Sequence, residues 1–202
     1  MIATLPLSTL RIVRSLAKDQ RAAAAMEFAM IAPIFITMIM GILDFGQWAY
    51  AQAELTGAVQ QAARSSTMET ADTTVADNMV RSFMGVIAPN VTVTSTRANY
   101  YDFTDVGRAE KWNDTNNNGT CDNGETYVDE NESGDWDPDI GRSGNGGASD
   151  VVVYSVTATY TSPFAVPFFP QSWNQRTLKA STTLKNQPYA YQVAYGSATG
   201  VC

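Results

Sequence analysis

An acidic stretch in the second half of the chain carries the spacing of a cation-binding loop. Residues 114–125 read DTNNNGTCDNGE, which places oxygen-bearing side chains at positions 1, 3, 5, 9 and 12 and a glycine at position 6. Such oxygens suit Ca²⁺, and the glycine permits the sharp turn between them. The predicted ligands of this first loop are Asp114, Asn116, Asn118, the backbone carbonyl of Thr120, Asp122 and Glu125.

A near-repeat of this loop begins after three intervening residues. Residues 129–140 keep oxygen donors at positions 1, 3 and 5 and the glycine at position 6, but Ile140 stands where the final glutamate is expected. Asp137 or Asp139 is the expected substitute for that glutamate. The predicted ligands of this second loop are Asp129, Asn131, Ser133, Asp135 and Asp137.

The two loops have no room for the helices that flank most calcium loops of this spacing. Three residues separate them, so the pair is similar to the helix-less EF-hand-type loops of extracellular bacterial domains. The alternative is a solvated acidic loop rich in asparagine and glycine. The full match of residues 114–125 favours calcium, so we expect structural Ca²⁺ that offsets repulsion between the carboxylates.

The chain has two cysteines, Cys121 within the first loop and Cys202 at the end. Two cysteines in an exported domain suggest one disulfide, with two separate thiols as the alternative. The bond would tie the chain terminus to the acidic loop.

Composition excludes several classes of function. The chain has no histidine, so Ser–His, Cys–His and two-histidine metal chemistries are ruled out. No nucleophile motif such as G-x-S-x-G is present, and we expect no enzymatic activity. The net charge is −7, and residues 100–150 hold thirteen acidic but three basic residues. This balance argues against nucleic acid as a partner.

A membrane-length apolar segment lies near the N-terminus. Residues 22–43 carry one charge, Glu27, and would span about 33 Å as a helix, enough to cross a bilayer. The basic residues before it predict a cytoplasmic N-terminus. Pro33 predicts a kink. We expect one helix to continue to about Ser66, with two stripes on its outer half: Ala49, Ala53 and Gly57, and Leu55, Val59 and Ala62.

The remaining chain reads as a small α+β domain. Residues 73–87 predict a helix, and residues 91–97, 151–160 and 177–184 predict strands. The expected fold is α+β: a long transmembrane helix, then a small antiparallel sheet, with the acidic calcium-loop insert. Residues 162–170, rich in proline and phenylalanine, would cap the core, lie on the membrane surface or contact a partner. Capping the core is the favoured interpretation.

Residues 21–64, RAAAAMEFAMIAPIFITMIMGILDFGQWAYAQAELTGAVQQAAR, resemble the TadE-like family of tight-adherence (Tad) pilus proteins. The resemblance rests on the small residues before Glu27, the place of Pro33, the GILDFG exit and the alanine-rich helix after it. It implies a pilin-like minor pilin or pseudopilin and cleavage by prepilin peptidase between Ala22 and Ala23. Retention as an uncleaved signal anchor stays open.

The resemblance also implies a role for the glutamate. Cleavage would make Glu27 the fifth residue, where it pairs with the amino terminus of a neighbouring subunit. A buried carboxylate needs such a cation or becomes protonated. The alternative is that Glu27 reaches the lipid headgroups, because it lies six residues after Arg21.

Two functional hypotheses follow. The first is a structural minor pilin, pseudopilin or assembly component of a Tad-type pilus, with other pilin subunits, the assembly machinery and prepilin peptidase as partners. The second is a membrane-anchored, calcium-binding adhesive or ligand-binding module. Both place a leader (1–21) in the bacterial cytoplasm, a helix (22–66) across the inner membrane and a domain (67–202) in the periplasm or outside the cell, with the insert at about 105–150.

Overall fold

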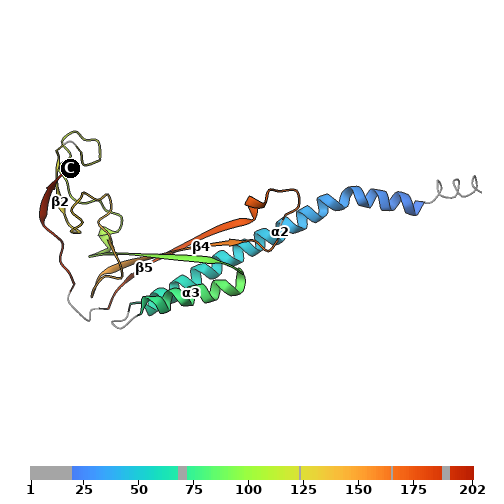
Figure 1. The fold of residues 1–202 in the computed structure, drawn as a ribbon, viewed down its shortest axis with the longest axis horizontal. Coiled ribbons are helices and arrows are strands. Elements are labelled where there is room, and N and C mark those ends of the chain that lie inside the picture. The colour runs from blue at the N-terminus through green and yellow to red at the C-terminus, as the bar shows by residue number, and fades with distance from the viewer. Residues whose placement is uncertain (1–19, 68–71, 123, 165, 188–191) are drawn as a thin grey trace, which may run out of the picture.

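The computed structural model describes residues 20–67, 72–122, 124–164, 166–187 and 192–202 (Figure 1). Most of the predicted leader, residues 1–19, lies outside these ranges. The helices are α2 (Gln20–Ser65), α3 (Thr73–Ile87), η1 (Phe103–Asp105) and η2 (Gln171–Asn174). The strands are β1 (Thr92–Tyr100), β2 (Thr126–Asp129), β3 (Arg142–Ser143), β4 (Val151–Thr161), β5 (Gln175–Lys185) and β6 (Ala198–Val201).

The helix α2 is continuous over 46 residues and passes through Pro33 without a break. The hydroxyl of Thr37 donates to the Pro33 carbonyl at 2.7 Å. Among the described residues, α2 is the one helix long and apolar enough to cross a membrane. In its most apolar stretch, 6% of the residues are buried. The N-terminal half of α2 therefore projects from the domain, as Figure 1 shows.

A four-stranded antiparallel sheet in the order β3-β1-β4-β5 forms the body of the domain. The three strands predicted from alternation are present as β1, β4 and β5, each longer than expected. β4 pairs with β1 from Val151 to Thr159 and with β5 along its whole length. The predicted α+β fold with a long N-terminal helix and a small antiparallel sheet is confirmed.

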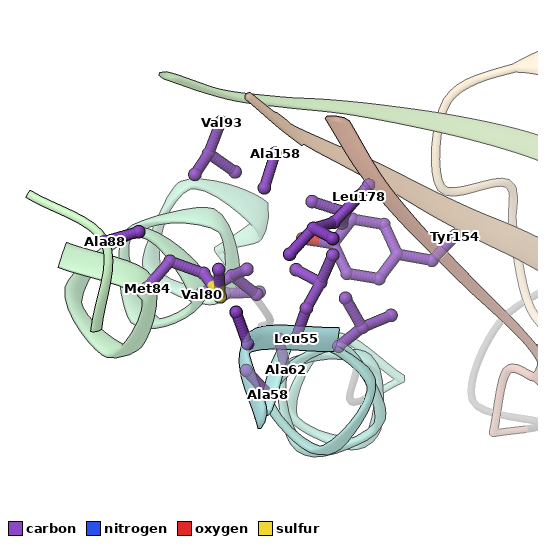
Figure 2. Close-up of a cluster of buried hydrophobic side chains, with 14 of the residues drawn as sticks. Leu55, Ala58, Ala62, Val80, Met84, Ala88, Val93, Tyr154, Ala158 and Leu178 are labelled. Carbon is purple, nitrogen blue, oxygen red and sulfur yellow. The ribbon is translucent and has the colours of Figure 1, made fainter. Parts of the chain in front are cut away.

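The core lies between the outer half of α2, the amphipathic α3 and one face of the sheet (Figure 2). The stripe Leu55, Val59 and Ala62 is fully buried in it. The other stripe, Ala49, Ala53 and Gly57, is exposed. The two stripes thus divide α2 into a face that builds the domain and a small-residue face that the domain leaves uncovered.

A second, two-stranded sheet lies at the end of the molecule farthest from the start of α2 (Figure 1). It pairs β2 with β6 in antiparallel register. Neither strand was predicted from the sequence. Each has four residues, and β2 lies between the two acidic loops, where turn residues hide the alternation.

Candidate functional site

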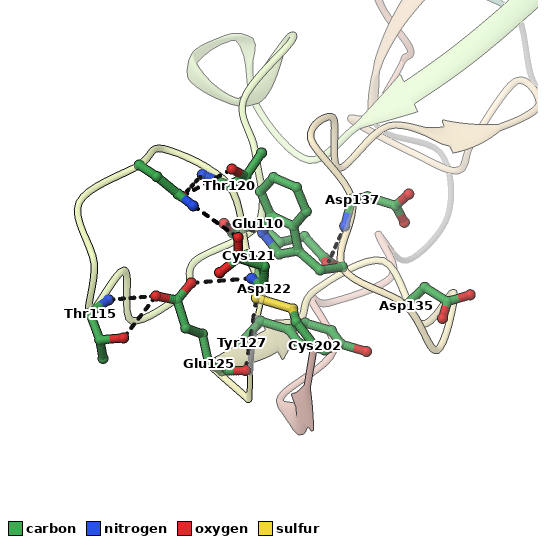
Figure 3. The surroundings of a disulfide bond; sticks show 12 residues. Glu110, Thr115, Thr120, Cys121, Asp122, Glu125, Tyr127, Asp135, Asp137 and Cys202 are labelled. Carbon is green, nitrogen blue, oxygen red and sulfur yellow. Dashed lines mark hydrogen bonds between the residues drawn. A yellow bond between two sulfur atoms is a disulfide. The ribbon is translucent and has the colours of Figure 1, made fainter.

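The carboxylate of Glu125 organises the first loop (Figure 3). Its Oε1 accepts hydrogen bonds from the backbone N–H of Thr115 at 2.7 Å and of Asn116 at 3.3 Å. Its Oε2 accepts from the N–H of Asp122 at 3.2 Å. Burial raises the pKa of Glu125, but a bond from the Thr115 hydroxyl at 2.8 Å and these backbone bonds outweigh it and hold the pKa below its ordinary value. Glu125 therefore closes the loop as an ionised group.

The other predicted side chains of this loop turn toward one another. Asp114 accepts from the N–H of Asn118 at 3.1 Å and of Gly119 at 2.9 Å. Asp122 accepts from the side-chain amides of Asn116 at 3.0 Å and Asn118 at 2.9 Å. Gly119 has a φ of +80°, the left-handed conformation that position 6 requires.

Thr120 at position 7 donates its N–H to the Asn118 carboxamide oxygen at 2.8 Å. Hydrogen bonds within the turn thus connect residues 114, 116, 118 and 122 to one another, and that these residues bind calcium stays a prediction.

The second loop repeats this geometry. Asp129 accepts from the N–H of Ser133 at 3.0 Å and of Gly134 at 2.9 Å, as Asp114 does at the matching positions. Asp137, at position 9, accepts from the amide of Asn131 at 2.8 Å and the hydroxyl of Ser133 at 2.7 Å. The carbonyl of Asp135, at position 7, accepts from the same hydroxyl at 2.9 Å.

The missing glutamate of the second loop is supplied by Glu110, which lies upstream of both loops. Its Oε1 accepts from the N–H of Glu130 at 2.7 Å and of Asn131 at 3.2 Å, and its Oε2 from that of Asp137 at 3.1 Å. These are positions 2, 3 and 9 of the loop, the same three that donate to Glu125 in the first. Glu110 is fully buried.

This arrangement corrects the expectation that Asp137 or Asp139 replaces the glutamate. Asp137 keeps its own place at position 9, and Asp139 instead accepts from the Tyr100 hydroxyl at 3.0 Å. Ile140, at position 12, packs with Tyr100 in a small core. The twelve-residue pattern begins at position 1, so it cannot predict that a residue before it, here Glu110, closes the loop.

The donor set of both loops fits a hard cation that prefers oxygen. Carboxylate, amide, hydroxyl and carbonyl oxygens suit Ca²⁺ and do not suit zinc, which takes cysteine and histidine. Within the described ranges, no three His, Cys, Asp or Glu side chains are grouped so as to hold a metal by themselves. A bound calcium would thus take part of its coordination from Asn, Ser and backbone oxygens.

A disulfide joins Cys121 to Cys202, with the Cα atoms 5.8 Å apart (Figure 3). Backbone bonds extend the contact, because the N–H of Cys202 donates to the Glu125 carbonyl at 3.0 Å. The N–H of Gly124 donates in turn to the Cys202 carbonyl at 3.2 Å. The predicted pairing is thus the one the structure contains, and it fixes the chain end beside the first loop.

A buried ion pair joins α2 to the sheet where the apolar segment ends. Asp44 is 6% exposed and pairs with Arg176 at the start of β5. The hydroxyl of Ser162, just after β4, donates to the other oxygen of Asp44. One turn further, Gln47 accepts from the Tyr160 hydroxyl at 3.0 Å. Asp44 directly follows the apolar segment 22–43, and no local pattern in the sequence predicts its distant partners.

The same helix contains the segment that matches a known protein family. Residues 22–64 match the family described as TadE-like protein. This segment is TadE-like. The match agrees with the resemblance found in the sequence. Comparison with curated proteins and with solved structures gives no match.

The TadE-like segment coincides with nearly all of α2. Glu27 and Ala23 lie in its projecting half and are exposed to their surroundings. The side chain of Ala22, on the other side of the predicted cleavage point, lies outside the described part of the structure. The segment also includes Asp44, so the TadE-like helix contributes both the apolar stretch and the ion pair that holds the domain.

Proposed function

We propose that this chain is a structural minor pilin or pseudopilin of a Tad-type pilus. The TadE-like match supports this role. The observation that most supports it is the difference between the two halves of α2. Its first half is an exposed apolar helix with one carboxylate, and its second half is the spine of the domain core. The basic residues before α2 support a domain on the periplasmic side of the inner membrane.

Glu27 acts in assembly under this proposal. A carboxylate among exposed apolar side chains is costly in lipid unless a cation neutralises it. Cleavage between Ala22 and Ala23 would create an amino terminus that supplies such a cation from a neighbouring subunit. The exposed stripe Ala49, Ala53 and Gly57 would allow the helices of neighbouring subunits to approach closely.

The first test is the mass and N-terminal sequence of the protein purified from its own membrane fraction. We expect a mature chain that begins at Ala23. A chain that keeps the basic leader would instead identify a signal-anchored assembly component, and the minor-pilin role would be wrong.

A second test compares Glu27→Gln with Glu54→Gln, a carboxylate on the outer half of the same helix. We expect Glu27→Gln to abolish co-purification with the pilin subunits after crosslinking, while Glu54→Gln retains it. Equal behaviour of the two variants would contradict a specific pairing role for Glu27.

We also propose that each acidic loop binds one structural Ca²⁺. Two loops with matching hydrogen bonds, each closed by a buried glutamate, support this proposal. Titration of the calcium-free protein by calorimetry should give two sites, with the millimolar affinity common in extracellular loops. Heat signals no different from those of magnesium would contradict a calcium-specific role.

The second candidate function is a membrane-anchored adhesive module. The position of both loops at the end of the molecule farthest from the start of α2 favours it (Figure 1). Pull-down with pilin subunits and the assembly ATPase separates the two functions, because an adhesive module with an incidental anchor would capture neither.

A further inference from the structure

The connection between β4 and β5 exposes a group of large apolar side chains. We call this group the apolar tip; it consists of the exposed Phe168, Phe169, Pro170 and Trp173 and the half-buried Val166 and Pro167. Phe168 is 85% exposed and Trp173 is 58% exposed. The rings of Phe169 and Trp173 lie against each other with centroids 4.9 Å apart. The tip therefore does not cap the domain core, so the favoured interpretation of residues 162–170 is wrong.

The apolar tip lies beside the projecting half of α2 (Figure 1). Phe168 lines a shallow hollow with residues 33, 34, 37 and 38 of the helix. Phe169 and Trp173 line a second hollow that reaches Gly41. These helix positions all precede Asp44, where the apolar segment ends.

The depth of these contacts follows from helix geometry. Met38 comes five residues before Leu43, and Pro33 comes ten before it. At 1.5 Å per residue, Phe168 thus lies roughly 8 to 15 Å below the outer end of the apolar segment. Half of a hydrocarbon core is about 15 Å thick. If α2 crosses a bilayer, the apolar tip therefore lies at the same depth as the lipid-facing surface of the helix, in the outer half of the hydrocarbon core.

The chemistry of the connection suits this layer. Residues 161–175 contain no charged side chain. Three prolines remove backbone donors that would be costly in lipid. The first charge after them, Arg176, is paired with Asp44 at the level where the apolar segment ends. Aromatic side chains such as Trp173 favour the interface between hydrocarbon and headgroups.

We propose that the apolar tip inserts into the outer leaflet of the bilayer crossed by α2, where phospholipid acyl chains cover Phe168. The subunit then has a second membrane contact besides its helix, and the two hold the domain in one orientation on the membrane. This inference rests on the proposed membrane anchoring of α2, because the exposed surface of the tip is continuous with that of the apolar half of the helix.

The experiment places one fluorescent label at a time on the full chain. The two native cysteines are joined in the disulfide, so a new cysteine provides the single free thiol. Phe168→Cys reports the tip, Ile34→Cys reports the helix, and Val75→Cys, at an exposed apolar site on α3, is the matched control. Each variant carries an NBD label and is reconstituted into phosphatidylcholine–phosphatidylglycerol vesicles with doxyl groups on the acyl chains.

We expect the label at residue 168 to be quenched several-fold more than the label at residue 75, and to a similar degree as that at residue 34. Quenching at residue 34 but not at residue 168 would overturn the inference and leave the anchor intact. Absence of quenching at both would overturn the anchor, and the inference with it. A blue-shifted but unquenched label at residue 168 would mean that protein covers the tip, which also overturns the inference.

Discussion

At the scale of single residues, Glu110 shows how a loop with calcium-binding spacing can be closed by a residue from outside its own sequence. It makes the same three backbone contacts in the second loop that Glu125 makes in the first. The first loop is closed by a glutamate at its own position 12, so all three contacts lie within the twelve-residue pattern. The second depends on a tertiary contact, which no local pattern encodes.

We predict that Glu110→Gln weakens calcium binding to the second loop at least tenfold, about 1.4 kcal/mol. The variant removes the charge that closes the loop and leaves the first loop unchanged. Calorimetric titration should show one site weakened and one retained. Glu132→Gln, a change of an exposed glutamate in the same loop, is the control and should keep both affinities. Equal effects of both variants would show that only overall charge matters.

A second residue-scale prediction concerns Asp77 on α3. Its carboxylate accepts from Arg97 at 2.7 Å, Tyr154 at 2.6 Å and Ser95 at 2.8 Å. Burial raises the pKa of Asp77, but these three bonds outweigh it and lower the pKa below the ordinary value. Because the folded pKa is lowered, its stabilisation is present above about pH 4 and is lost as pH falls through the folded pKa.

Asp77→Asn should therefore lower the free energy of unfolding by about 2 kcal/mol at pH 7 and flatten its dependence on pH below 4. Chemical denaturation of the detergent-solubilised protein between pH 2 and 7 measures both effects. Asp102→Asn, a change of an exposed aspartate that caps η1, is the comparison and should leave most of the acid dependence in place. An unchanged pH profile in Asp77→Asn would contradict the assignment.

At the scale of elements, the long helix, α3 and the three main strands were predicted because each has a clear period. Leu55, Val59 and Ala62 recur at helical spacing and form the core stripe, and Val151–Thr161 alternates along a buried strand. The short strands β2 and β6 could not be predicted, since their pairing depends on the chain end returning to the insert. The Asp44–Arg176 pair was missed for the same reason: its partners are 132 residues apart.

Asp44→Asn should loosen the domain from the membrane helix. Removing one partner of a buried ion pair leaves the other charge without a partner, which should lower the free energy of unfolding by about 3 kcal/mol. This value is low for a buried pair because Arg176 is partly exposed. Thermal unfolding in detergent and limited proteolysis near residue 44 should both reveal the loss. Glu54→Gln on the same helix is the control. If Asp44→Asn is cleaved at the same rate as the wild-type protein, the ion pair does not hold the domain to the helix.

The disulfide supports the second sheet in a way that can be measured locally. We expect the double variant Cys121→Ser, Cys202→Ser to lose protection from hydrogen exchange in β2 and β6 and to keep it in β4 and β5. Closure of an 81-residue loop stabilises by about 4.5 kcal/mol in the chain-entropy treatment. Uniform loss of protection over all four strands would show instead that the two sheets unfold together.

At the scale of the whole molecule, the functional features are separated along one long axis. The projecting half of α2 lies at one end, the helix–sheet core in the middle, and the acidic loops with the second sheet at the other (Figure 1). The sequence predicted the order of these parts. It did not predict that the β4–β5 connection folds back along the apolar half of α2, because only the assembled sheet determines where that connection ends.

The position of the disulfide also governs how the molecule would carry mechanical load. A pull on the terminal Cys202 passes through the sulfur bridge straight to Cys121 and bypasses the residues between them. About 80 residues, or roughly 280 Å of extensible chain, are thereby removed from the loaded path. Strands β4 and β5 lie inside this unloaded ring. Tension between the distal end and the helix is borne instead by the shorter chain before residue 121.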